Sequence, residues 1–249
     1  TTSVYGGNAP ILPRAIDIAE SFADAIGNGS ALFNGSSDSI HAGDLNNYVQ
    51  NINNFSVTAW VYPTHTATGN TYYSLVNHWD YSSVQNWGIW LHTDGATDSA
   101  LHWNGGGSAS SAVEDGTKRI ATNQWTHVCA TKNGTAIKLY VNGIEVQSGT
   151  DSASSIPNVV GNLRIGAQGS SGSDSAFYKG NISQAGIWTG TLTQEKIQSL
   201  MESTSYAKIP ADVKSNLGSE LFTDGDMEAS GTTGWDDHVN THDATLSKE

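Results

Sequence analysis

The chain has 249 residues, with 24 acidic against 11 basic side chains and a formal net charge of −13. So acidic a surface repels phosphate backbones and anionic lipids, which argues against nucleic acids and membranes as partners. The single cysteine, Cys129, cannot form an internal disulfide, and no run of about 18 apolar residues is present that would span a bilayer.

The first part of the chain predicts an N-terminal arm over residues 1–29. Residues 1–14 hold two glycines and two prolines and favour an extended tether, whereas 15–27 fit either a short helix or an irregular strand. The first strands are then expected at 30–34 and 39–41, on either side of a turn.

Residues 55–62 predict a central strand. Two alternating sets of side chains occupy its faces: Val57, Ala59 and Val61 on one, Thr58, Trp60 and Tyr62 on the other. Both faces therefore carry bulky groups, as expected of a strand with neighbours on both sides. A shorter strand at 73–76 is predicted to lead into a long polar loop.

Residues 87–92 and 100–104 predict a hairpin joined across Thr93-Asp94-Gly95. Its apolar side chains recur at every second position, which predicts that Ile89, Leu91, Leu101 and Trp103 face the core. Three larger or polar side chains then point the other way: Trp90, His92 and His102.

The stretch QWTHVCATKNGTAIKLYVNGIEV, residues 124–146, predicts three short strands. Asn133-Gly134 and Asn142-Gly143 are expected to supply the positive φ angles of tight hairpin turns. Ile137, Leu139 and Val141 share one face of the middle strand, which indicates an antiparallel sheet packed on a second layer.

Strands at 163–166 and 182–188 are expected to close a two-sheet sandwich. Thr193 then resembles a helix N-cap, with Glu195 in the first turn and Ile197, Leu200 and Met201 on one face. The fold class expected is therefore all-β, an antiparallel two-sheet β-sandwich with one short C-terminal helix.

Five segments in register resemble the laminin-G-like, concanavalin-A-like jelly rolls. The central one is W-x-H-V-x-A…N-G…I-x-L-Y-V-N-G, accompanied by ALFNGSSDSI, FSVTAWVYP, LRIGAQ and YKGNISQAGIWTGTLTQEKI. The resemblance implies a jelly-roll domain over residues 30–205.

The lead-in SVYGGNAPILPRAIDIAESFADAIGNGSALFNG resembles that of marine phage virion proteins, especially tail and fibre components. The low cysteine count also favours a viral or bacterial source.

The C-terminal part, residues 206–249, predicts a linker followed by the truncated start of a second module. From 216 onward NLGSELFTDGDMEASGTTGW resembles the opening of jelly-roll carbohydrate-binding modules, with Asp224, Asp226 and Glu228 among the matching positions. About the first 30 residues of such a module are present.

No catalytic motif accompanies the predicted fold. Glycanases of this kind carry two carboxylates in a Glu-x-Asp-x-x-Glu strand, and that run does not occur here. Neither does a zinc-protease helix motif nor a Gly-x-Ser-x-Gly elbow. A non-catalytic protein is expected, with a degenerate glycanase as the least favoured alternative.

Two groups of aromatic and polar residues are candidate sugar-binding sites, because pyranose rings stack on aromatic faces. One is the predicted loop containing Trp79, Asp80 and Tyr81, where Trp79 and Tyr81 are expected to be exposed. The other is the outward set Trp90, His92 and His102, for which exposure and packing are equally compatible with the sequence.

The resemblance also implies a structural calcium ion where the first and last strands meet, held by Asp38 and by the position that Ser183 occupies. Ser183 stands where the family usually has Asp, which halves the charge available. The eight histidines show no metal-ligand spacing in the sequence and are expected to be mostly structural.

The function expected is recognition of cell-surface glycans, or of a host-surface receptor, by a phage or bacterial protein on a virion or extracellular surface. The alternative is a structural virion component that assembles with other virion subunits and binds no glycan. A homo-oligomer is compatible with either function.

Overall fold

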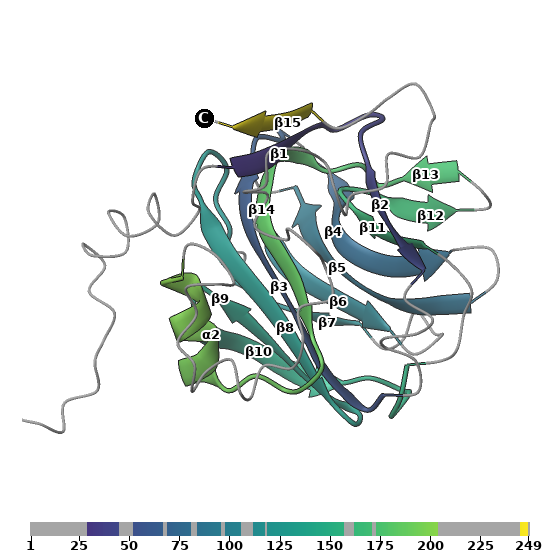
Figure 1. The fold of residues 1–249 in the computed structure, drawn as a ribbon, viewed down its shortest axis with the longest axis vertical. Helices are drawn as coiled ribbons and strands as arrows, with labels where there is room; N and C mark the ends of the chain where they lie inside the picture. The colour runs from purple at the N-terminus through teal and green to yellow at the C-terminus, as the bar shows by residue number, and fades with distance from the viewer. Residues whose placement is uncertain are drawn as a thin grey trace, which may run out of the picture.

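The computed structural model of the chain describes residues 29–44, 52–66, 69–80, 84–95, 98–105, 112–117, 119–156, 162–170, 173–203 and 245–248. In these residues two large, mainly antiparallel sheets form a sandwich, and one short helix lies against the outside (Figure 1). The predicted all-β jelly roll is therefore confirmed. The predicted arm and second module fall almost entirely outside the described residues.

The first sheet is seven-stranded, with β3 at its centre between β8 and β14. Its strands in spatial order are β10 (Ile144–Thr150), β9 (Ala136–Val141), β8 (Thr126–Asn133), β3 (Asn54–Pro63), β14 (Lys179–Trp188), β1 (Gly29–Asn34) and β15 (Thr245–Lys248). The central position predicted for residues 55–62 is confirmed. The last strand, β15, pairs with β1 and so extends the edge of this sheet.

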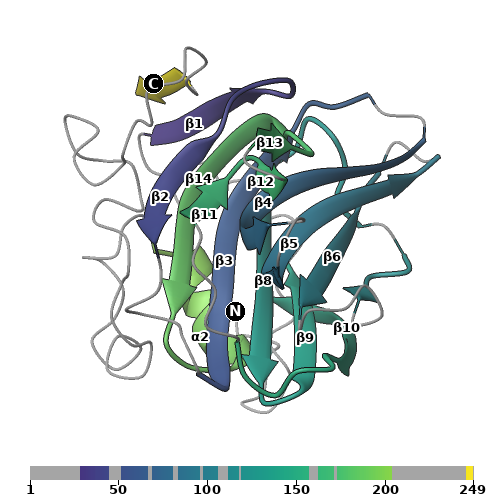
Figure 2. The same cartoon turned by 90° about the vertical axis from the view of Figure 1, so that its right-hand side faces the viewer.

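The second sheet contains the hairpin β5–β6 that the sequence predicts. Its strands are β13 (Ser173–Ser175), β12 (Gln168–Ser170), β4 (Asn70–Asp80), β5 (Val84–Asp94), β6 (Ala100–Gly105) and β7 (Val113–Glu114), while β11 (Asn162–Ile165) pairs with β4 and with β2 (Ile40–Asp44). Figure 2 shows β4, β5 and β6 side by side and strongly curved.

The core lies between the two sheets and follows the period of two. Phe55 from β3 meets Trp87 and Trp103 of the other sheet, with ring centroids 5.0 and 5.8 Å apart. The two tryptophans stack at 6.1 Å, and all three rings are at most 1% exposed. Such large apolar rings stabilise the sandwich both through the area they bury and through their mutual orientation.

The three-stranded meander is confirmed, with one difference in turn geometry. Asn142 and Gly143 both have positive φ, as predicted, whereas in the first turn only Gly134 does, at 59°. Asn133 instead remains in β8 and pairs with Ala136.

The helix α2 (Gln194–Met201) covers part of the outer face of the first sheet. Thr193 caps it by accepting a hydrogen bond from the Lys196 amide, and Ile197 and Leu200 are buried, as predicted. They share a cluster with Tyr140, so the helix covers the outer face of β9 at this residue. None of the helical residues described belongs to a segment long and apolar enough to cross a membrane.

Candidate functional site

The outer face of the second sheet carries the three side chains that the sequence predicted would point away from the core. Trp90 pairs with His102 across β5 and β6. The alternate residues Ile89, Leu91, Leu101 and Trp103 belong to the main core cluster, as the sequence predicts. The predicted orientation is confirmed. The three residues are nevertheless only 4–7% exposed, so this face is covered by its own neighbouring side chains.

Trp90 is held flat against the sheet by three contacts. Its indole N–H donates to Gln168 Oε1 at 2.9 Å, and its ring meets Trp79 edge-on at 5.5 Å. Beneath it lies Gly88, where a Cβ atom would be only 2.5 Å from Trp90 Cη2. Glycine at this position therefore gives the indole the space to lie over β5.

Trp79 is not on an exposed loop, and that expectation is wrong. Strand β4 continues through Asp80 and pairs with β5, with an irregularity between His78 and Asp80. Trp79 is only 4% exposed because its ring packs edge-on against Trp90. The predicted binding roles of Asp80 and Tyr81 rest on side chains that lie outside the described residues.

Among the described residues of this face, Tyr72 has an exposed aromatic side chain, which the sequence pattern did not indicate. It lies on β4 opposite His92, is 39% exposed and stacks on the His92 ring at 4.1 Å with an interplanar angle of 8°. His102 meets it edge-on at 5.0 Å. The period-two alternation of β4 could have placed it here once the strand was known to begin at Asn70.

Glu114 brings the two histidines together. Its Oε2 lies 2.7 Å from His92 Nδ1 and 2.9 Å from His102 Nδ1, while His92 Nε2 lies 3.0 Å from Asn70 Oδ1. The hydrogen bond from His102 is the largest influence on the pKa of Glu114, and with His92 it lowers that pKa despite partial burial. The sequence spacing of the histidines does not indicate this cluster, because residues 92, 102 and 114 converge only through strand register.

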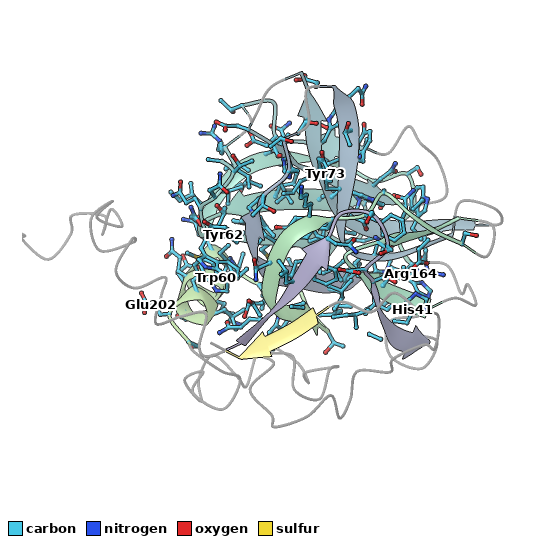
Figure 3. All side chains as sticks on the ribbon, turned by 90° about the horizontal axis from the view of Figure 1, so that it is seen from above. His41, Trp60, Tyr62, Tyr73, Arg164 and Glu202 are labelled. Carbon is cyan, nitrogen blue, oxygen red and sulfur yellow. The ribbon has the colours of Figure 1, made fainter. Side chains whose placement is uncertain are left out.

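A second polar cluster ties β2, β11 and β13 together around Asp174. Its carboxylate accepts hydrogen bonds from Ser39 at 2.5 Å, His41 at 2.9 Å and Arg164 Nε at 2.9 Å. Burial raises the pKa of Asp174, but the hydrogen bonds and charges of these partners outweigh it and hold the pKa at about 2. Figure 3 shows His41 and Arg164 close together, consistent with their direct pairing across β2 and β11.

The two residues of the expected calcium site lie at opposite ends of β1. Asp38 accepts hydrogen bonds from the backbone and side chain of Asn34, whereas Ser183 donates to the Gly29 carbonyl. Five rises of an extended strand, from Gly29 to Asn34, span roughly 17 Å, so Asp38 and Ser183 would not share one ion. Calcium binding stays a prediction, which these two residues do not support as a pair.

The two-sheet fold places the chain among the concanavalin-A-like jelly rolls. A family model described as the concanavalin A-like lectin/glucanases superfamily (Laminin_G_3) matches residues 34–198. The chain therefore belongs to this family. A search among curated proteins gives no match.

Several solved structures have similar folds. The heptameric SAP-like pentraxin of Limulus polyphemus is 15% identical, with a TM-score of 0.54 over 71% of this chain and 82% of that one. The CBM40 of Ruminococcus gnavus IT-sialidase bound to α2,3-sialyllactose is 12% identical, with a TM-score of 0.51 over 70% and 96%. Domain 4 of the Geobacillus stearothermophilus arabinanase AbnA is 25% identical, with a TM-score of 0.49 over 69% and 76%.

Proposed function

We propose that this chain is a non-catalytic glycan-binding domain whose ligand stacks on Tyr72 at the outer face of the second sheet. The observation that carries the proposal is the 39% exposure of Tyr72 on a face where Trp90, His92 and His102 also gather. Among the described residues of this face, the rings of Trp79 and Trp90 are buried. Tyr72 thus offers the accessible ring surface that sugar stacking requires.

The surroundings of Tyr72 suit a polar ligand. Its ring is held in place by the parallel His92 ring and by the edge of His102, so little side-chain freedom is lost on binding. Asn70 is exposed, and the side chain of Glu114 is 29% exposed. Groups that can form hydrogen bonds with sugar hydroxyls therefore lie beside the Tyr72 ring.

The family and the similar structures support the class of ligand. The CBM40 relative in fold is bound to a sialylated lactose. The charge of −13 in this chain disfavours anionic sugars, so we propose neutral glycans as its ligands. Such a domain would act at a virion or extracellular surface, in agreement with the context that the sequence predicts.

A glycan array probed with the full chain, with calcium and zinc present, tests the proposal. We expect neutral glycans among the bound spots, and calorimetry with a bound glycan should then show at least about tenfold weaker binding for Tyr72→Ala, equivalent to about 1.4 kcal/mol. Tyr72→Phe keeps the ring and should bind within about threefold of the unchanged chain.

The matched control is Tyr62→Ala, a half-buried tyrosine on the first sheet. It should leave glycan affinity unchanged. If no glycan on the array binds, or if Tyr72→Ala binds as tightly as Tyr62→Ala, the proposed site is wrong.

A further inference from the structure

We infer that His92, His102 and Glu114 form a binding site for a divalent transition metal ion of the zinc class. The three side chains come from adjacent strands, β5, β6 and β7, and one ligand atom from each lies within 4.8 Å of the others. The register carries this convergence, because His102 pairs directly with Glu114 and lies beside His92 on the same face.

The identity of the donor atoms selects the metal. Two imidazole nitrogens with one carboxylate oxygen are characteristic ligands of Zn²⁺, whereas Ca²⁺ and Mg²⁺ prefer oxygen ligands alone. Glu114 Oε2 is 2.7 Å from His92 Nδ1 and 2.9 Å from His102 Nδ1. Tetrahedral zinc with bonds of about 2.0–2.1 Å separates its ligands by roughly 3.3 Å, so each of these two oxygen–nitrogen separations has to widen by only about half an ångström.

His92 is also supported in the way that metal-bound histidines are. Its second ring nitrogen, Nε2, is 3.0 Å from Asn70 Oδ1, an acceptor for an N–H group. A proton fixed on Nε2 leaves the lone pair of the neutral ring on Nδ1, which points at Glu114. The Nδ1 atoms of His92 and His102 both face Glu114 Oε2. A metal cation bound by these three atoms would replace the protons of the two N–H···O hydrogen bonds.

One side of the group is accessible to solvent. His92 and His102 are nearly buried, whereas the Glu114 side chain is 29% exposed and Tyr72 beside them is 39% exposed. Three protein ligands with an open fourth position hold water or an exchangeable oxygen ligand. The site thus opens toward the same surface as Tyr72.

Titration of the full chain, freed of metal by a chelator, with ZnCl₂ in a calorimeter tests the inference. We expect one ion bound per chain, with calcium binding at least about 100-fold more weakly at this site. Glu114→Gln should weaken zinc binding at least about tenfold, and His102→Ala should do the same. With Co²⁺ in place of zinc, the visible absorption of a low-coordinate cobalt site should appear and be lost in both variants.

The control is Glu145→Gln, which removes a partly exposed carboxylate paired with Lys138 on the first sheet. It should bind zinc like the unchanged chain, and thermal unfolding should show that Glu114→Gln remains folded. Absence of zinc binding, or equal binding by Glu114→Gln, His102→Ala and Glu145→Gln, would overturn the site. Neither result depends on whether a glycan binds.

Discussion

Replacing Asp151 with Ala should lower the free energy of unfolding by about 3–5 kcal/mol, because Lys132 would be left as an unpaired buried cation. Lys132 Nζ lies 3.1 Å from Asp151 Oδ2, and both side chains are 1% exposed. Burial lowers the pKa of Lys132, and the Asp151 carboxylate opposes this change. Removing the carboxylate therefore removes the group that stabilises the charged amine.

Asp151 also holds neighbouring groups in place. Its Oδ1 accepts from the Ala153 amide at 3.0 Å, and its Oδ2 accepts from Trp103 Nε1 at 3.3 Å. Lys132 in turn donates to the Ala153 carbonyl at 2.6 Å. The ion pair thus joins β8, β6 and the segment after β10, and its loss leaves several buried polar groups unsatisfied.

Urea denaturation of Asp151→Ala beside Glu145→Ala measures the difference. The Lys138–Glu145 pair has nearly the same separation, 2.8 Å, but its side chains are 48% and 35% exposed, so its loss should cost less than about 1 kcal/mol. The double variant Lys132→Met/Asp151→Leu should recover part of the loss because it removes both charges. Equal effects of Asp151→Ala and Glu145→Ala would contradict the prediction.

The strand positions of this chain could be predicted because its apolar side chains alternate so regularly. Val57, Ala59 and Val61 in β3 and Ile137 and Leu139 in β9 fall on the core face as expected. The same regularity predicted which way the outer residues of the β5–β6 hairpin point. Period two determines the face of a side chain but does not determine what covers that face.

The exposure of the candidate site could not be predicted for that reason. Trp90 is covered by Trp79 of the neighbouring strand and by Gln168, which is 78 residues away in the chain. The polar run around Asn77 and His78 resembles a loop in the sequence, yet these side chains are buried within β4. A buried strand with many polar residues is wrongly predicted as a loop when the partners of those residues come from distant segments.

The histidine–glutamate cluster was missed because its spacing has meaning only across strands. His92 and His102 are separated by the hairpin turn, and Glu114 follows another connection before pairing with His102. The spacing of these three residues in the sequence does not predict that their side chains are close unless the register of all three strands is known. The convergence of donor atoms is a property of the sheet rather than of a motif.

Acidification from pH 7 to pH 5 should lower the free energy of unfolding by about 4 kcal/mol through two buried histidines, His65 and His127. Burial lowers the pKa of His65 to about 4 and that of His127 to about 3, from an ordinary value of 6.5. His127 packs edge-on against Trp60 at 5.3 Å, and its Nδ1 has no hydrogen-bond partner among the described residues. A proton on either ring is therefore poorly tolerated in the folded chain.

The unfolded chain binds these protons below about pH 6.5, whereas the folded chain does so only near pH 4 and pH 3. Stability is then fully present above pH 6.5 and is lost as the pH falls, with a slope of up to about 2.7 kcal/mol per unit for the two groups. Asp174, with a pKa of about 2 instead of 3.8, contributes a loss only at lower pH, as the pH falls from 3.8 toward 2.

Urea denaturation at a series of pH values between 7 and 5 separates the contributions. His127→Gln should be less stable at pH 7 but should lose only about half as much stability on acidification, because one of the two proton acceptors of the unfolded chain is gone. The double variant His65→Gln/His127→Gln should be nearly insensitive to pH in this range. If the double variant shows the full slope of the unchanged chain, other groups cause the acid sensitivity, and the buried neutral state of these rings is not its origin.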